Sequence, residues 1–295
     1  MNLLDPDVMA KAESLGMLAR QVVEGYRVGE HRSPFHGFAL EFAQHREYGS
    51  GDDLKHLDWK LLGKTDRLYI KQYEQDTNFT ANILLDGSAS MNYGSGKMTK
   101  LEYAKILAAC LAYTIFAQRD AVALDIFDTA SRVHISRTDN PGRLHEILAR
   151  LAGFEATAST DLGGALRDLA AQLRSKGIVI LLSDLFDGEE AFSKGIERLR
   201  FQGTEVIVFH VLAPEEITFP LQGPTHFHDV EGGPDLLSNP EDIRAGYLAE
   251  FNAFQARIRL ACERANIHYV LANTGVPVGE TLNAYLAFRR KTTAR

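Results

Sequence analysis

Apolar strands that alternate with helices are the feature that most constrains the fold of this chain. Four apolar runs of strand length stand at residues 82–86, 121–127, 178–183 and 205–212. Stretches with helical spacing of apolar residues separate most of them, for example residues 98–118. Strands that are apolar on both faces belong to mostly parallel sheets with helices on both sides. The pattern therefore predicts an α/β fold with a doubly wound, mostly parallel sheet.

The remaining elements complete this sheet and its covering layers. The runs at 121–127 and 132–136 are close enough for a hairpin, which predicts one antiparallel strand at the sheet edge. The sheet is then expected to be at least five strands wide, before a further strand at 267–271. Other helices are predicted over residues 6–26, 140–151, 161–175, 189–201, 241–265 and 279–290.

Length and chain breakers predict two parts. The 295 residues exceed a typical single domain. We assign residues 1–79 to an N-terminal helix and a small glycine-interrupted module with a strand at 67–74, and residues 80–295 to the large α/β domain. The segment 214–240 is expected to leave the sheet as an excursion because prolines interrupt it: Pro214, Pro220, Pro224, Pro234 and Pro240.

Composition excludes several classes of protein. Acidic residues outnumber basic ones by 39 to 32, so the chain lacks the overall basic charge of a dedicated nucleic-acid binder. Cys110 and Cys262 form no CxxC pair, and we expect both to be buried as small apolar groups. No uninterrupted apolar run has the length of a membrane span, and we predict a cytoplasmic protein.

Oxygen-bearing side chains follow two of the predicted strands. Asp86, Ser88 and Ser90 come at the end of the first apolar run, Asp184 follows the run at 178–183, and Thr160 precedes the helix that leads into it. The carboxyl ends of parallel strands form a crevice where strand order reverses, so these side chains are expected to face a common point. Hydroxyl and carboxylate oxygens suit a hard divalent cation such as Mg²⁺ that keeps some of its water. An acidic residue of a partner protein could fill the exchangeable position.

The segment DGSASM at 86–91 resembles the DxSxS motif of von Willebrand factor type A domains. Thr160 and Asp184 fall where that superfamily supplies the other ligands of its metal-ion-dependent adhesion site. Residues 36–76 resemble the signature of the prokaryotic family called domain of unknown function 58, and the likeness continues through SASM, KLEYAK and STDLGGAL. The matching signature residues are Arg46, Tyr48, Gly51, Asp52, Asp53, Asp58 and Trp59.

The resemblance implies roles for these residues and a setting for the protein. It implies direct coordination by Ser88 and Ser90, coordination by Thr160 directly or through water, and contact through water for Asp86 and Asp184. The cation would be Mg²⁺, or another hard ion such as Mn²⁺ or Ca²⁺. Family members commonly accompany MoxR-type AAA+ ATPases, which implies a metal-dependent protein–protein interaction module that helps to assemble or activate other proteins. The chain resembles the family's short subgroup without transmembrane helices.

Several alternatives stay open from the sequence. The Asp and Ser residues alone could cap a helix, and the site could belong to a Mg²⁺-dependent phosphohydrolase or be vestigial in a scaffold protein. We predict no enzyme, because GSGKMT at 94–99 lacks the phosphate-loop spacing and no GxSxG elbow is present. His226 and His228 could bind a transition metal with Asp229, although a surface hairpin without metal is the more frequent case. Trp59 is expected to bury its ring between the small module and the sheet domain.

Overall fold

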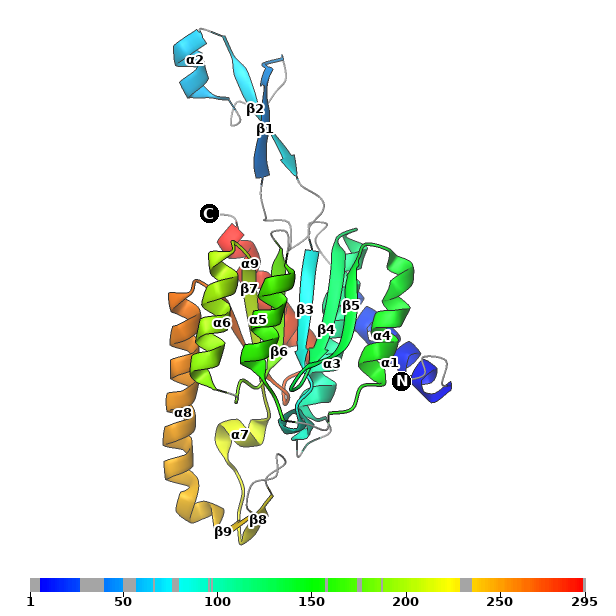
Figure 1. The fold of residues 1–295 in the computed structure, drawn as a ribbon, viewed down its shortest axis with the longest axis vertical. Helices are drawn as coiled ribbons and strands as arrows, with labels where there is room; N and C mark the ends of the chain where they lie inside the picture. The colour runs from blue at the N-terminus through cyan, green and yellow to red at the C-terminus, as the bar shows by residue number, and fades with distance from the viewer. Residues whose placement is uncertain are drawn as a thin grey trace.

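The computed structural model describes residues 6–26, 40–49, 57–65, 67–75, 80–94, 96, 98–156, 159–173, 177–186, 188–228 and 235–293. Its centre is a six-stranded sheet with the order β10-β7-β6-β3-β4-β5 (Figure 1). The six strands are β3 (Thr80–Asp86), β4 (Ala121–Phe127), β5 (Ser131–Thr138), β6 (Ile178–Ser183), β7 (Glu205–Leu212) and β10 (His268–Asn273). All neighbours are parallel except β4 and β5, which pair antiparallel at one edge.

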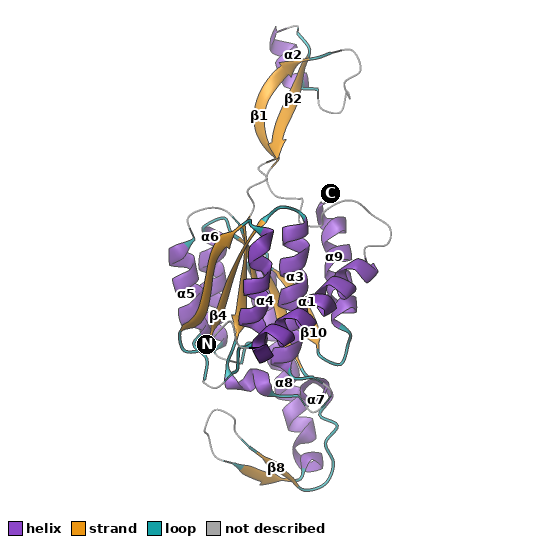
Figure 2. Ribbon diagram, turned by 90° about the vertical axis from the view of Figure 1, so that its right-hand side faces the viewer, coloured by secondary structure: helices purple, strands orange, loops and turns teal. Residues whose placement is uncertain are grey.

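Helices cover both faces of this sheet, as Figure 2 shows. One face carries α1 (Pro6–Tyr26), α3 (Lys100–Ala117), α4 (Leu144–Ala152) and α9 (Val278–Thr293), and the other carries α5 (Leu162–Gln172), α6 (Glu189–Phe201) and α8 (Pro240–Arg264). Every residue of β3, β6 and β7 is buried, because each lies inside the sheet with helices on both sides. The predicted doubly wound α/β fold is therefore confirmed.

The strand order reverses between β3 and β6. From β3 the chain passes through α3 to β4 on one side, and after β5, α4 and α5 it returns to β6 on the other side of β3. Chain segments that leave the carboxyl ends of two such strands diverge and open a crevice between them. Asp86 ends β3 and Asp184 follows β6, so both lie at this reversal point.

Most predicted elements agree with the structure to within a few residues. The helices at 6–26 and 189–201 have the predicted bounds. The antiparallel edge strand is β5, and Cys110 and Cys262 are both buried. The segment 214–240 does leave the sheet: it forms the short helix α7 (Pro214–Thr218) and a hairpin of β8 (Thr225–Phe227) and β9 (Leu236–Ser238). In Figure 1 these elements lie beyond the carboxyl ends of the parallel strands.

The N-terminal helix packs against the sheet domain. Ala12, Ala19 and Val23 of α1 are buried in the core that also contains residues of α3 and α4. The following segment forms a separate antiparallel pair, β1 (Leu40–Glu47) with β2 (Tyr69–Gln75), and a helix α2 (Trp59–Thr65). The predicted boundary between 1–79 and 80–295 stays a prediction, and the signature residues Gly51, Asp52 and Asp53 lie outside the described residues.

The expectation for Trp59 was wrong. Its side chain is 67% exposed, at the first residue of α2. The preceding residues are held on β2 instead: Leu57 bridges to Ile70, and the Asp58 amide donates to the Tyr69 carbonyl at 2.8 Å. Because Leu57 and Asp58 are the buried residues at this turn, the tryptophan that follows them faces outward.

Candidate metal centre

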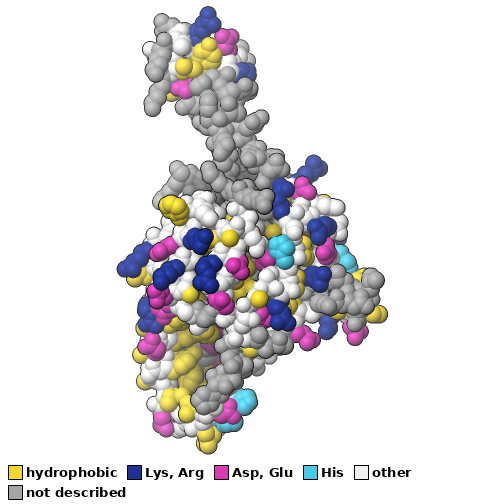
Figure 3. All heavy atoms as spheres, viewed as in Figure 1, with side chains coloured by type: hydrophobic (Ala, Val, Ile, Leu, Met, Phe, Trp, Pro, Cys, Tyr) yellow, Lys and Arg dark blue, Asp and Glu magenta, His cyan; other side chains and the backbone are white. Residues whose placement is uncertain are grey.

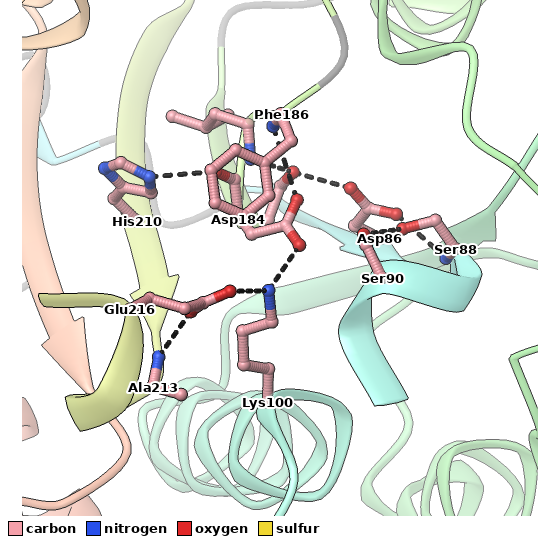
Figure 4. A network of polar contacts seen from close by, with 11 residues as sticks. Asp86, Ser88, Ser90, Lys100, Asp184, Phe186, His210, Ala213 and Glu216 are labelled. Carbon is pink, nitrogen blue, oxygen red and sulfur yellow. Dashed lines mark hydrogen bonds and ion pairs between the residues drawn. The ribbon is translucent and has the colours of Figure 1, made fainter. Parts of the chain in front are cut away.

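The turn after β3 brings Asp86, Ser88 and Ser90 together. The amide of Ser88 donates to Asp86 Oδ1 at 2.9 Å, and the two serine hydroxyl oxygens lie 3.0 Å apart. A short 3-10 helix, η2 (Ala89–Asn92), begins directly after Ser88, and no side chain caps it. The alternative that these side chains cap a helix is therefore not supported at η2. Figure 4 shows the three side chains together at the carboxyl end of β3.

Gly87 allows this turn to lie close to its neighbours. Its amide donates to the Phe127 carbonyl at the end of β4, at 2.7 Å. A Cβ atom at this position would lie 2.5 Å from ring atoms of Phe154, which is closer than real contacts come. The glycine in DGSAS therefore lets the strand-end turn pack under the Phe154 ring.

Asp184 is reached through a second turn, after β6. Ser183 Oγ donates to Asp86 Oδ2 at 2.6 Å and accepts a hydrogen bond from the Leu185 amide at 2.9 Å. Leu185 has a φ of 60°, a left-handed conformation that costs energy for a residue with a side chain. This turn fixes Asp184 beside Asp86, and both carboxylates are almost completely buried, at 0% and 1% exposure.

Thr160 lies on the loop that enters α5. The amide of the next residue, Asp161, donates to the Asp128 carbonyl at 2.9 Å, one residue beyond the carbonyl that binds Gly87. On the other side, Asn92 Nδ2 donates to the Ala156 carbonyl at 2.9 Å and ties η2 to the start of the same loop. Thr160 Oγ1 is buried and has no hydrogen-bond partner among the described residues.

Lys100, which the sequence analysis did not select, is part of this site. It is the first residue of α3, and its ammonium lies 2.7 Å from Asp184 Oδ2 and 2.7 Å from Glu216 Oε1 of α7. The side chain is 1% exposed. Figure 4 shows it extending from α3 to the two carboxylates, and the Phe186 ring centroid lies 4.9 Å from its ammonium. Lys100 therefore links three segments of the site.

The site carries more buried negative than positive charge. Burial and the neighbouring charge of Asp184 raise the pKa of Asp86 to about 7. Burial alone would lower the pKa of Lys100, but Asp184 and Glu216 outweigh it and raise that pKa, so the ammonium stays charged. Burial raises the pKa of Glu216, against the attraction of Lys100. In this region of the described chain, two carboxylates thus contact the Lys100 ammonium, and a third, Asp86, lies beside Asp184.

His210 supports the turn after β6 as a neutral ring. Burial lowers the pKa of His210 to about 4, so the ring is neutral at physiological pH. Its Nε2 lies 2.8 Å from the Asp184 carbonyl oxygen, which can only accept, and its Nδ1 lies 2.8 Å from the Tyr269 hydroxyl. The proton is therefore on Nε2, and Tyr269 donates to Nδ1. One ring nitrogen therefore holds the backbone of Asp184, and the hydrogen bond from Tyr269 to the other fixes the ring.

Four of the five predicted residues are joined by contacts in the structure, and the fifth lies on the adjoining loop. Asp86, Ser88 and Ser90 form one turn, and Ser183 links Asp86 to the Asp184 turn. Thr160 is connected through backbone bonds of its neighbour to the end of β4. The sequence analysis missed Ser183, Lys100, His210 and Glu216. Ser183 had a signal, because it precedes Asp184 at a strand end, whereas Lys100 and Glu216 are separated by 116 residues.

These residues fit a hard divalent cation. The donors are hydroxyl and carboxylate oxygens, the kind that Mg²⁺ and Mn²⁺ prefer. The buried hydroxyl of Thr160 has no partner within the described chain, and the carboxylates of the site exceed its ammonium groups. Both carboxylates already accept hydrogen bonds at both oxygens: Asp86 from Ser88 and Ser183, and Asp184 from Lys100 and Phe186.

Fold and site together define a doubly wound α/β protein with a polar centre at the carboxyl ends of β3 and β6. The chain belongs to the family described as protein of unknown function DUF58, whose model matches residues 44–257. This confirms the resemblance drawn from the signature segment. Uncharacterized protein Rv1480 of Mycobacterium tuberculosis is 24% identical over 232 residues, which cover 78% of this chain and 73% of that protein.

Solved structures match this chain at low sequence identity. An aerotolerance-related membrane protein from Bacteroides fragilis matches with a TM-score of 0.50 and 17% identity, over 72% of this chain and all of that one (100%). The VWA domain of SpRpn10 matches with a TM-score of 0.43 and 15% identity, over 70% of this chain and 95% of that domain. In the described part of this chain, no helix has the length and apolar character needed to cross a membrane.

Proposed function

We propose that this protein is a metal-dependent binding module, in which Mg²⁺ or a similar hard cation at the strand-end site binds a carboxylate of a partner protein. Ser88, Ser90 and Thr160 would supply hydroxyl ligands, with Asp86 and Asp184 acting mainly through water. When bound, the cation supplies a positive centre with an exchangeable position, to which an acidic side chain can coordinate. The protein residues hold and orient the ion.

The observation that carries this proposal is the charge imbalance of the site. Asp184 and Glu216 share the ammonium of Lys100, and the buried carboxylate of Asp86 lies beside Asp184. Buried charge is costly unless it is paired or bound to a metal. A divalent cation beside Asp86 would offset this excess, and the buried Thr160 hydroxyl, which has no hydrogen-bond partner within the described residues, would be available as a ligand.

The partner that best fits the family resemblance is a MoxR-type AAA+ ATPase, with an acidic residue offered to the ion. We propose assembly or activation of other proteins as the joint task, in the cytoplasm. A single charge-assisted contact adds direction and salt dependence to an interface. The surrounding surface would supply the rest of the binding energy.

The test is capture of a purified MoxR-type ATPase by the immobilised full chain. We expect capture in Mg²⁺, loss of capture in a chelator, and at least about tenfold weaker capture by Ser88→Ala, because a ligand of the ion is removed. Ser136→Ala is the matched control, since Ser136 is an exposed residue of β5 whose hydroxyl contacts His134, away from the strand-end site. Equal capture under all these conditions would remove the proposal.

A metal-dependent phosphohydrolase is the rival hypothesis, and it needs a general base near the ion. His210 is the histidine that contacts this site, and both its nitrogens are engaged, with the Asp184 carbonyl and the Tyr269 hydroxyl. This arrangement supports the binding module. Mg²⁺-dependent turnover of a panel of phosphoesters, abolished by Asp86→Asn, would favour the enzyme instead.

A further inference from the structure

The hairpin beyond α7 carries a second cluster of groups that bind metals. One ligand atom from each of His226, His228 and Asp235 can be chosen so that all three lie within 4.8 Å of one another. The two carboxylate oxygens of Asp235 face different rings, with Oδ2 3.4 Å from His226 Nε2 and Oδ1 2.5 Å from His228 Nδ1. Figure 3 shows histidine side chains beside an acidic group at the end of the molecule that carries this hairpin.

The strand register brings these three residues to one face. Thr225, His226 and Phe227 pair with Ser238, Leu237 and Leu236, so the next pair of positions is His228 and Asp235. Side chains alternate along a strand, which puts His226 and His228 on the same face, and opposed residues share a face. The two ring centroids are 5.8 Å apart.

The other face of the hairpin is anchored to the protein. The Phe227 ring stacks on Phe219 with centroids 6.1 Å apart and planes at 8°. Phe219 in turn stacks on Tyr247 of α8, with centroids 4.3 Å apart. This row of rings fixes which way the hairpin faces, so the histidine face turns to solvent, with the two side chains 60% and 75% exposed.

We propose that His226, His228 and Asp235 form a surface site for a late first-row transition metal ion, with Zn²⁺ as the expected occupant. Two imidazoles and one carboxylate are ligands for Zn²⁺, whereas Mg²⁺ prefers oxygen alone. Zinc holds nitrogen ligands at about 2.0 Å, which puts tetrahedral neighbours about 3.3 Å apart. The observed nitrogen–oxygen distances of 2.5 Å and 3.4 Å bracket this value, and the three ligand atoms all lie within 4.8 Å of one another, so small side-chain rotations suffice.

Three protein ligands leave one tetrahedral position for water or for a side chain of another protein. The ion would join β8 to the start of β9 and hold the hairpin in one shape. Leu237, which stands opposite His226 and is 73% exposed, lies on the same face of the hairpin as this cluster. The sequence analysis paired the histidines with Asp229, which lies outside the described residues; the structure brings Asp235 to them instead.

The test is calorimetric titration of Zn²⁺ into the zinc-free full chain, equilibrated with excess Mg²⁺ so that the strand-end site does not compete for zinc. We expect one zinc site, weakened at least about tenfold by His226→Asn, His228→Asn or Asp235→Asn, since each removes a ligand. His134→Asn is the matched control, because His134 is also an exposed histidine bound to one carboxylate, Asp125 at 2.7 Å, but has no second histidine. It should bind zinc as the unaltered chain does.

Two results would overturn this site. Zinc affinity that is unchanged in the three ligand variants would place the ion elsewhere, and the absence of a zinc site in the unaltered chain would leave Asp235 as an ordinary ion-pair partner of the two rings. Asp86→Asn must not change zinc binding, and His226→Asn must not change Mg²⁺ binding. The site is therefore tested independently of the proposed function.

Discussion

At the scale of single residues, the strand-end site buries carboxylates whose negative charge has to be neutralised. Asp86 is held by the Ser88 amide and the Ser183 hydroxyl, and within the described residues its carboxylate is not paired with a cation. Asp184 and Glu216 share Lys100. The two aspartates therefore differ. The charge of Asp184 is neutralised by Lys100, whereas the charge of Asp86 must be neutralised by a proton or by an added ion. Two predictions follow from this difference.

The first prediction concerns pH without metal. The pKa of Asp86 is raised to about 7 in the folded protein, so the folded state binds a proton that the unfolded chain releases at lower pH. This contribution to the free energy of unfolding is complete below about pH 4 and is lost as pH rises through about 7. In a chelator, urea unfolding should therefore show the unaltered chain losing stability relative to Asp86→Asn between these pH values. Saturating Mg²⁺ should remove that loss, since the ion favours the carboxylate.

A constant stability difference between the two proteins across this pH range would mean that Asp86 does not titrate as the structure indicates. The comparison with Asp86→Asn isolates this residue from other groups whose pKa is shifted, such as Glu216.

The second prediction concerns Lys100→Met. Removal of the ammonium leaves the carboxylates of Asp184 and Glu216 without a positive charge beside them, and breaking a buried ion pair in this way costs about 3–5 kcal/mol. We expect that loss in the free energy of unfolding in a chelator, with part of it restored by Mg²⁺. Lys194→Met is the control, because Lys194 pairs with Glu190 on the exposed surface of α6, where such pairs contribute little. Equal stability of the two variants would contradict the role given to Lys100.

At the scale of elements, local patterns were sufficient for most of the sheet and its helices. The spacing of apolar residues and the residues at helix ends are local signals, and they predicted α1, α3 and α6. Asp86, Ser88 and Ser90 were also visible, because they follow a strand in sequence. Contacts between distant segments gave no such signal: Lys100 has the appearance of an ordinary first-turn helix residue, and Asp184 is 84 residues away. The prediction for Trp59 was wrong for the same reason, since the exposure of its side chain depends on the contacts of Leu57 and Asp58 with β2.

The packing of α1 gives a prediction at this scale. Ala19 is 1% exposed, and its carbonyl lies against Cys110 of α3, with the sulfur 3.9 Å from the oxygen. Ala19→Asp would bury an unpaired charge between these helices and should lower the free energy of unfolding by several kcal/mol. Ala10→Asp, at an exposed position of the same helix, is the control. Similar urea midpoints for both would show that α1 is not part of the sheet domain's core in solution.

At the scale of the whole molecule, the polar centre and the hairpins occupy different regions. The strand-end site lies where β3 and β6 finish, with α7 and the β8–β9 hairpin beyond it (Figure 1). The β1–β2 pair precedes β3 in the chain and so joins the sheet at the opposite, amino end of that strand. A partner bound at the metal centre would therefore meet α7 and the β8–β9 hairpin before the signature segment.

Binding of Mg²⁺ to the full chain, compared between the unaltered protein and Thr160→Val, tests the central claim most directly. Valine keeps the shape of threonine and removes the buried hydroxyl, and Thr65→Val removes an exposed hydroxyl on α2 as a control. We predict one Mg²⁺ site by calorimetry, weakened at least about tenfold by Thr160→Val and unchanged by Thr65→Val, with Mg²⁺ at about 100 times its dissociation constant stabilising the unaltered fold by about 2.7 kcal/mol. No Mg²⁺ binding, or equal binding by both variants, would contradict the account.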